Sequence, residues 1–462
     1  MPNVNKLKII LQDLTGQKAP FFDTPIPENA ISLLTSGAGL GFSQLNELLL
    51  MLGYDRITHS FFQFLVNGTI EYRPDSSINS FEQLRKGVDH FRKIAILFYG
   101  NVKFAFKNLS GDPVEFEGFL ASLKPMNSRE YKKRHDPVLP IETIPPENTY
   151  YLGYIIEEEL RKKIENGDST AIDEEKRRTL IVEKGKTNHE AYLACDHLDV
   201  YVATSMRLPH EYLFANRTIN QIFKNSILKD LKLRWFDPTQ AYCQSRIDKS
   251  LAEALMLKRA KCTIYLAQES ETLGKDSELA CTLAQGKPVI VYIPKVNEMY
   301  VDEYLSDLKK INKNDTEKEI ILEQLRVFDS SLAWEKDSKI QEWINNPDTT
   351  DLKSIKKLLE KTMRQQYDKK AEVLCETHPL GIQVNITTGV ANGVLVVRTI
   401  KQCAKLIKNI VLKKLEFNLD VEKKGSLEYL YLREKISNCV FRVVTGDAKL
   451  TNTFWNYYLK QE

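Results

Sequence analysis

The chain has 462 residues, which is enough for about two or three domains of roughly 150 residues each. Hydrophobic residues make up 42% of the chain and charged residues 27%, so its composition excludes a largely disordered or fibrous protein. The formal net charge is only +3, which excludes a protein drawn to nucleic acid by a large overall positive charge and leaves a local basic patch open.

Cysteine usage and the N-terminal segment bear on the cellular compartment. The seven cysteines are odd in number, are scattered along the chain and include no CxxC pair, which predicts reduced thiols in a cytoplasmic protein. The N-terminal segment lacks an apolar core followed by a cleavage site, and no stretch approaches ~18 uninterrupted apolar residues, so we expect neither secretion nor a membrane span. The histidines show no metal-ligand spacing, and we predict no metal site.

Residues 1–125 are predicted to form a compact α+β domain. Apolar residues between Gln44 and Val66 recur at helical spacing, whereas the segment 94–106 is dense in β-branched and aromatic residues and suits either strands or a buried helix. Residues 126–194 are predicted to be a connector, first rich in proline and then highly charged, because proline interrupts regular elements and mixed charges suit a solvated helix.

Residues 195–296 alternate short apolar runs with helical patterns. The runs at 199–203, 233–236, 262–267 and 289–293 predict four strands, and the segments between them predict helices. This alternation predicts an α/β domain with a parallel sheet covered by helices on both faces.

The rest of the chain is predicted to contain a helical segment and a third unit. Residues 297–372 are charged and helical in pattern, and residues 373–462 are predicted to form a C-terminal α+β domain. In that domain we expect a hairpin at 381–397 turning at Asn392-Gly393, a helix near 402–413, strands near 415–421 and 439–444, and a terminal helix. The lysines between 405 and 414 suit either a solvated helix surface or a nucleic-acid contact.

Ligands of open parallel sheets bind outside the carboxyl ends of the strands, which selects a set of candidate binding residues. They are Thr204, Ser205 and Arg207 after the first strand, Asp237 and Gln240 after the second, and Ser277 at the start of the helix after the third. The two hydroxyl residues could contact a ribose or cap the following helix, and the arginine could bind a pyrophosphate or be a solvated surface charge.

Glu278 is the candidate catalytic residue. If Asp276 or Ser277 caps its helix, Glu278 lies in the first turn, half-buried at the margin of an apolar face and directed toward the carboxyl edge of the sheet. The alternative is that this glutamate is in the first turn only because the helix dipole favours acidic residues there.

The run 245–267, followed by KDSELACTLAQGKPVI at 275–290, resembles TIR domains and equally the nucleoside 2-deoxyribosyltransferases, a related flavodoxin-like group. The resemblance covers about a hundred residues. Both families have a glutamate at the position of Glu278 and use it to attack or stabilise the anomeric carbon of a ribose. The resemblance implies a flavodoxin-like, TIR-like domain that cleaves an N-glycosidic bond, most simply that between nicotinamide and ribose in NAD, with NAD as substrate and no further cofactor.

The chemistry of the leaving group favours NAD. The nitrogen of nicotinamide in NAD is positively charged, so its departure needs only one carboxylate beneath the developing oxocarbenium ion. A neutral nucleoside needs a second acid to protonate its base, and neither Asp237 nor Asp276 is securely matched to such a residue.

Bacterial proteins that join a TIR-like domain to unfamiliar flanking domains resemble anti-phage effectors. This resemblance implies an enzyme that is silent until it is triggered, and activation through a homo-oligomer or a partner protein. Two other functions stay open. One is a deoxyribosyltransferase-like N-glycosidase that releases a purine or pyrimidine base, and the other is a non-catalytic scaffold that only assembles or binds a nucleotide signal.

Overall fold

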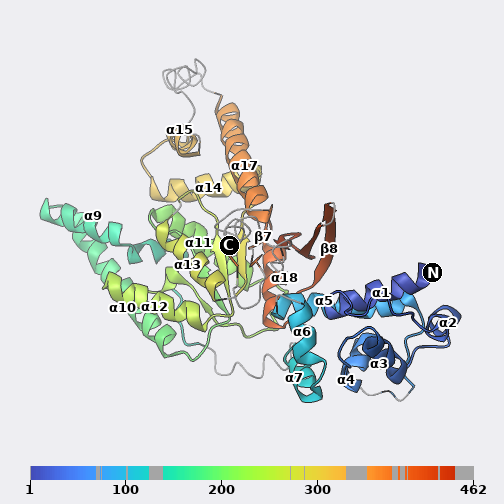
Figure 1. The fold of residues 1–462 in the computed structure, drawn as a ribbon. Coiled ribbons are helices and arrows are strands. Elements are labelled where there is room, and N and C mark those ends of the chain that lie inside the picture. The colour runs from blue at the N-terminus through green and yellow to red at the C-terminus, as the bar shows by residue number, and fades with distance from the viewer. Residues whose placement is uncertain are drawn as a thin grey trace, which may run out of the picture.

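The computed structural model of the chain describes residues 2–68, 73, 75–99, 102–123, 139–270, 272–285, 287–328, 351–376, 383–384, 391–392, 394–424 and 427–442. A helical N-terminal unit and a larger α/β unit are visible in Figure 1, with the sheet at the centre of the larger one. No helix among the described residues is long and apolar enough to cross a membrane.

A five-stranded parallel sheet forms the core of the larger unit. Its strands are β1 (Val200–Ala203), β2 (Trp235–Phe236), β3 (Cys262–Leu266), β4 (Val289–Tyr292) and β7 (Leu395–Val397), in the order β2-β1-β3-β4-β7. The four predicted strands and the predicted parallel sheet are confirmed. The strands could be predicted from the sequence because strands buried on both faces are continuous apolar runs.

The fifth strand differs from the expected arrangement. Residues 381–397 were expected to form a hairpin of a separate C-terminal domain, turning at Asn392-Gly393. Instead β5 (Gln383–Val384) pairs with β6 (Ala391–Asn392), and β7 pairs in parallel with β4 of the central sheet. The apolar run 395–397 gains burial on both faces by extending the sheet, which a separate two-stranded hairpin could not provide.

Helices cover both faces of the sheet. On one face α11 (Pro209–Phe223) and α18 (Ile400–Val411) pack against Val200 and Val202 of β1. On the other face α12 (Arg246–Arg259), α13 (Leu273–Ala284) and α17 (Leu352–Glu376) pack against the side that includes Tyr201. Successive strand residues point to opposite faces, so Tyr201 is directed toward α12 and α13.

Three helices are described in the segment between β4 and β7, over residues 298–328 and 352–376. They are α14 (Glu298–Ile311), α15 (Glu317–Phe328) and α17, which lie together at the top of Figure 1. This confirms the helical character predicted for 297–372 over the part of that segment that the structure describes. The helices share the core of the α12 and α13 face, to which they contribute Leu305, Leu325 and Leu359.

The expected connector packs closely against the α/β unit where the structure describes it. It forms the short helix η1 (Pro146–Leu152), α9 (Tyr154–Glu165) and α10 (Ser169–Ala194). Asn188 of α10 bonds to the backbone of Glu142 and Gln240, which fixes the segment to the start of the loop after β2. Residues 126–138 of this segment lie outside the described residues.

The described N-terminal residues form helices, where an α+β domain was expected. These helices are α1 (Pro2–Thr15), α2 (Glu28–Ser36), α3 (Phe42–Met51), α4 (His59–Asn67), α5 (Phe81–Tyr99), α6 (Val102–Leu109) and α7 (Pro113–Leu123). An isolated bridge between Leu40 and Ile78 is the β pairing found among them. The described parts of 94–106 belong to the helices α5 and α6. The apolar residues Ala95 and Ile96 continue the helical spacing of Leu84 and Val88 in α5, and Val102, Ala105 and Phe106 are buried in α6.

A three-stranded antiparallel sheet borders the N-terminal helices. Its strands are β8 (Phe417–Lys424), β9 (Leu427–Glu434) and β10 (Val440–Arg442), in the order β10-β9-β8. The strands expected near 415–421 and 439–444 correspond to β8 and β10, while β9 was not predicted. Leu432 of β9 is part of the N-terminal hydrophobic core, so the sheet connects the two units. The terminal helix expected after this sheet lies outside the described residues.

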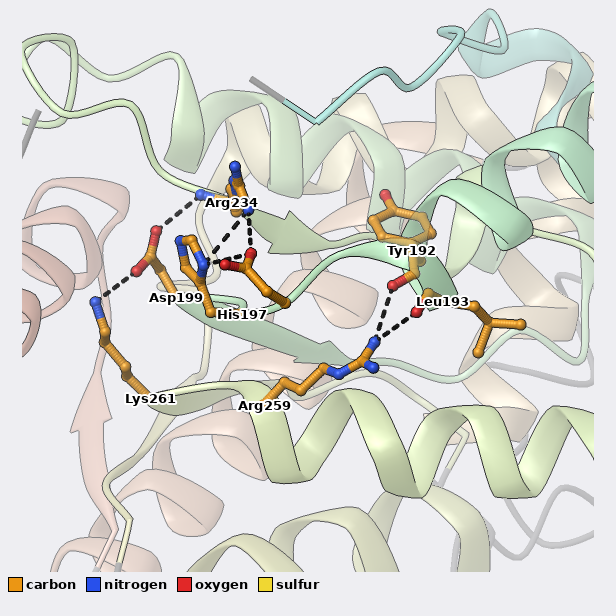
Figure 2. Close-up of polar contacts among 8 residues, drawn as sticks. Tyr192, Leu193, His197, Asp199, Arg234, Arg259 and Lys261 are labelled. Atoms are coloured by element: carbon orange, nitrogen blue, oxygen red, sulfur yellow. Dashed lines mark hydrogen bonds and ion pairs between the residues drawn. The ribbon is translucent and has the colours of Figure 1, made fainter. Parts of the chain in front are cut away.

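Asp199 ties together the amino ends of three strands (Figure 2). Its carboxylate accepts a hydrogen bond of 2.9 Å from the backbone N–H of Arg234, just before β2, and one of 2.8 Å from Nζ of Lys261, just before β3. Asp199 is fully buried, so its bond to the Arg234 N–H is formed away from water, whereas the side chain of Lys261 is 41% exposed. The two bonds hold β1, which carries Tyr201, in a fixed position relative to β2 and β3.

Candidate active site

Glu278 lies in the second turn of α13, not in the first. The helix begins at Leu273, and its N-cap is Thr272, whose side chain accepts a hydrogen bond from the backbone N–H of Lys275. The expected caps, Asp276 and Ser277, are inside the helix. The helix therefore begins four residues earlier than a cap at Asp276 would allow, and Glu278 falls in its second turn. Because the helix runs back along the strands from the carboxyl edge, this turn lies over the face of the sheet and away from that edge.

The carboxylate of Glu278 contacts a tyrosine of the central strand. The hydroxyl of Tyr201 donates a hydrogen bond of 2.9 Å to Oε1 of Glu278. Tyr201 is 1% exposed, and its ring stacks on that of Phe236 with centroids 5.1 Å apart. The tyrosine is therefore held in one orientation, and it fixes the carboxylate in turn.

A second carboxylate, that of Glu253 on α12, acts electrostatically on Glu278. Burial raises the pKa of Glu278 to about 8, the negative charge of Glu253 adds to this rise, and the hydrogen bond from Tyr201 and the charges of Lys249 and Lys275 oppose it. Burial also raises the pKa of Glu253, although Lys249 lies 3.8 Å from its Oε1. The site thus holds two acidic groups in a setting that disfavours negative charge.

This arrangement fixes what Glu278 can do. With a pKa near 8 the side chain is mostly protonated at neutral pH and can donate a proton. A cation placed beside it would stabilise the ionised form and convert it into a nucleophile or an electrostatic stabiliser. The charge state of the group is therefore responsive to the charge of a ligand.

A second tyrosine–carboxylate pair lies on the next strand. The hydroxyl of Tyr265 in β3 donates to Oδ1 of Asp276 at 2.9 Å, and the ammonium of Lys275 lies 4.7 Å from the centre of the Tyr265 ring. Nζ of Lys275 donates to the carbonyl of Ser270 at 3.1 Å. These contacts fix the first turn of α13 on the sheet, immediately before the turn that carries Glu278.

The carboxyl edge of the sheet is closed by the protein itself. Oγ1 of Thr204 and the backbone N–H of Ser205 both donate to Oε1 of Gln268, each at 2.7 Å. The hydroxyl of Ser205 donates at 3.0 Å to Oε2 of Glu211, which also accepts the backbone N–H groups of residues 207 and 208 as the cap of α11. The capping role considered for Thr204 and Ser205 is therefore wrong, since the N-cap of α11 is Leu208 and the capping side chain is that of Glu211. Their ribose contact stays a prediction.

A polar cluster fills the crevice between β1 and β3, where the strand order reverses. Nε2 of His210 lies 2.7 Å from Oε1 of Glu269, and the hydroxyl of Tyr304 on α14 contacts the other oxygen of Glu269 and donates to Gln324 on α15. Burial lowers the pKa of His210, but the bond to Glu269 and nearby carboxylates outweigh this and raise it overall. The remaining cavity of about 10 Å³ has room for about one water molecule. The inserted helices thus occupy the usual ligand position of such sheets.

The other predicted binding residues are dispersed around Glu278. Arg207 is exposed, and Ser277 is exposed and donates to the carbonyl of Leu273 in its own helix. The side chain of Gln240 is paired with the backbone of Ile144, at 2.7 and 3.2 Å. Asp237 is buried and bonds to Thr239; burial raises its pKa to about 6, and these bonds moderate the rise. None of these side chains has a hydrogen bond to Glu278 within the described part of the chain, so their binding roles stay predictions.

Tyr201 and Glu253 are the site residues that we did not predict. Tyr201 is one of several apolar-looking positions of a buried strand, and Glu253 is one charge among many on an amphipathic helix. The fact that Glu253 lies four residues after Lys249 indicates only a helix-surface ion pair. Their proximity to Glu278 arises from the packing of α12 and α13 on β1.

Within the described ranges, no three His, Cys, Asp or Glu side chains are gathered as metal ligands would be. Comparisons of the chain with known protein families, with curated proteins and with solved structures gave no match. The functional conclusion therefore rests on the geometry around Glu278 and on the sequence resemblance.

Proposed function

We propose that the chain is an NAD glycohydrolase whose α/β unit is a flavodoxin-like, TIR-like domain, and that Glu278 is its catalytic carboxylate. In this reaction the bond between nicotinamide and ribose breaks, its electron pair leaves with nicotinamide, and water supplies the hydroxyl at the anomeric carbon. The strand order β2-β1-β3-β4-β7 supports the fold assignment, since it is the 2-1-3-4-5 order of flavodoxin-like sheets.

The observation that carries the proposal is the half-buried carboxylate of Glu278, whose pKa is raised by burial and by the charge of Glu253. In the unliganded site, burial and the charge of Glu253 disfavour the ionised form of Glu278. A cationic ligand would offset both effects, so its binding would be coupled to ionisation of this carboxylate. NAD presents a positive nicotinamide ring, and the oxocarbenium ion that follows is positive too. Binding would ionise Glu278, and Tyr201 would keep the carboxylate oriented toward the anomeric carbon.

The closed state of the site supports activation by a trigger. Glu278 is half-buried between α12, α13 and β1, and the carboxyl edge of the sheet is covered by α14 and α15. Opening would require these helices to move, as assembly into a homo-oligomer or binding of a partner protein could achieve. We propose a cytoplasmic, triggered effector of anti-phage defence, supported by the resemblance of its domain plan to such effectors.

The test is the release of nicotinamide from NAD by the purified full-length protein at a concentration that promotes assembly. We expect release by the wild type and its loss in Glu278→Gln, which keeps the shape of the side chain and the bond to Tyr201 but cannot ionise. Cys281→Ser, at an exposed position of the same helix, is the matched control and should retain activity. Equal release by wild type and Glu278→Gln would overturn the assignment of Glu278.

The second acid, Glu253, favours one alternative. Its interaction with Glu278 supplies the proton donor that hydrolysis of a neutral nucleoside needs, which the sequence alone did not indicate. In that reaction one group would protonate the base and the other would stabilise the ribosyl cation. Release of free purine or pyrimidine from nucleosides, with NAD left intact, would identify this N-glycosidase.

The other alternative is a non-catalytic scaffold. Cellular activity that survives Glu278→Ala would identify it, since a scaffold does not need the carboxylate.

A further inference from the structure

Two cysteines that are far apart in the sequence contact each other beside the edge strand of the sheet. Cys375 is in the last turn of α17, the last of the inserted helices, and Cys439 directly precedes β10. Their Sγ atoms are 3.3 Å apart, across a sequence separation of 64 residues. Neither cysteine forms a disulfide in this structure.

Cys439 is held in place by its surroundings. Its sulfur accepts the backbone N–H of Val396 in β7 at 3.1 Å, and the residue is 1% exposed. Its carbonyl accepts the N–H of Glu434, and the carboxylate of Glu434 accepts the N–H and the hydroxyl of Ser437 in the intervening turn. The thiol therefore has a fixed position at the outer edge of the parallel sheet.

Cys375 is the more accessible of the two thiols. It is half-buried at the end of a helix, where a side-chain rotation meets less resistance than in a helix interior. A disulfide has a sulfur–sulfur distance of about 2.05 Å, so the two sulfurs need to approach by about 1.2 Å. This movement is within the reach of a change in the side-chain torsion of Cys375.

We propose that Cys375 and Cys439 form a reversible disulfide that fastens the end of α17 to the edge of the sheet. The oxidant is a small-molecule disulfide of the glutathione type. The thiolate of Cys375 attacks it, which forms a mixed disulfide and releases one glutathione thiolate. The thiolate of Cys439 then attacks the sulfur of Cys375, which forms the protein disulfide and releases the second. The two cysteine protons end on the two glutathione thiolates.

The order of the two attacks follows from the environments of the thiols. The hydrogen bond with Cys375, followed by burial, holds the pKa of Cys439 well above its ordinary value, so Cys439 is the poorer first nucleophile. Conversion of Cys375 into a mixed disulfide removes the thiolate charge and weakens the acceptor sulfur through which Cys375 raises the pKa of Cys439. The second attack thereby becomes easier once the first has occurred.

The proposed disulfide would act on a helix that covers the polar cluster. Tyr367 of α17 lies at the cluster of His210 and Glu269, and Asp368 accepts a hydrogen bond of 2.6 Å from Arg398 at the end of β7. The disulfide adds a covalent attachment about two turns further along the same helix. It would hold the inserted helices in the closed position, whether or not the chain cleaves NAD.

The test is peptide mapping of the reduced full-length protein after exposure to oxidised glutathione. We expect a peptide pair linked through Cys375 and Cys439, which is lost on return to reducing conditions. Cys439→Ser should instead accumulate a glutathione adduct at Cys375, because the resolving thiol is missing. Cys281→Ser, at the exposed cysteine on α13, is the control and should retain the linked pair.

A second readout does not depend on any variant. The oxidised wild type should unfold at a temperature higher than the reduced protein by about 3 °C or more, since a closed loop of this length restricts the unfolded chain. Absence of the linked peptide pair overturns the proposal, whether Cys375 carries a stable adduct or stays reduced. A linked pair that leaves the unfolding temperature unchanged overturns its role in fastening α17.

Discussion

The hydroxyl of Tyr201 on β1 donates a hydrogen bond of 2.9 Å to the carboxylate of Glu278 on α13, across 77 residues of sequence. Two opposing effects meet at this bond. Burial favours the neutral form of Glu278, while the hydrogen bond favours the ionised form. The bond therefore sets both the orientation of the carboxylate and the pH range in which it changes charge.

The raised pKa of Glu278 predicts a loss of stability with rising pH. Between its ordinary value near 4.5 and about 8, the folded chain keeps a proton that the unfolded chain has released. Folding stability therefore falls as pH rises through this window, by at most about 1.4 kcal/mol for each pH unit. Glu278→Gln removes this contribution. Urea unfolding between pH 5 and 8 should show the variant gaining stability over the wild type as pH rises.

Ser277→Ala is the control for that measurement, because the side chain is exposed on the same helix and carries no titrating group. Its stability should follow that of the wild type across the range. If the Glu278→Gln curve also stays parallel to the wild type, Glu278 has an ordinary pKa and the electrostatic account of the site is wrong.

Tyr201→Phe tests the hydrogen bond itself. The variant keeps the ring that stacks on Phe236 and removes only the hydroxyl, so the ionised form of Glu278 loses its stabilising partner. A hydrogen bond to a charged group is worth about 1.5–3 kcal/mol, which predicts a ten- to hundredfold fall in nicotinamide release at pH 7. The acid limb of the pH–rate profile should move to higher pH.

Tyr265→Phe removes an equivalent hydroxyl from the neighbouring strand, where the partner is Asp276. If this variant moves the acid limb as far as Tyr201→Phe does, the effect reflects general loosening of α13. An unchanged profile for Tyr265→Phe assigns the effect to the bond with Glu278.

The strands of the central sheet were predictable because their signal is local. Each is a short apolar run flanked by helical periodicity, and burial on both faces requires only that run. The strand β7 carries the same apolar signal, but its pairing with β4 depends on the three inserted helices that return the chain to the sheet edge. Local sequence does not encode that return, so the strand was assigned to another domain.

The candidate site was predictable in part. The position of Glu278 on the helix after β3 followed from the sequence, but its turn did not, because Thr272 and not Asp276 or Ser277 caps the helix. Tyr201 and Glu253 approach Glu278 only through the packing of helices on the sheet. In the N-terminal unit, composition alone could not decide between helix and strand, since the aromatic density at 94–106 suits buried helices as well as strands.

Glu253→Gln distinguishes the two proposed reactions. Removing its charge should lower the pKa of Glu278 and move the acid limb of NAD cleavage to lower pH, with activity at pH 7 retained. If Glu253 is instead needed as a proton donor to a neutral base, the variant should lose base release from nucleosides by about a hundredfold or more. Asp248→Asn, an exposed acid on the same helix, should change neither activity.

Asp199 provides a test of the scaffold that positions Tyr201. Asp199→Ala removes the acceptor of the buried Arg234 backbone N–H before β2 and of the partly exposed Lys261 ammonium before β3. We expect a loss of about 2 kcal/mol or more in the free energy of unfolding. Asp199→Asn, which keeps an acceptor oxygen, should lose less than half as much. Urea titration of the three proteins measures this order, and equal losses for both variants would show that the packing of the side chain, and not its hydrogen bonds, holds the strand ends together.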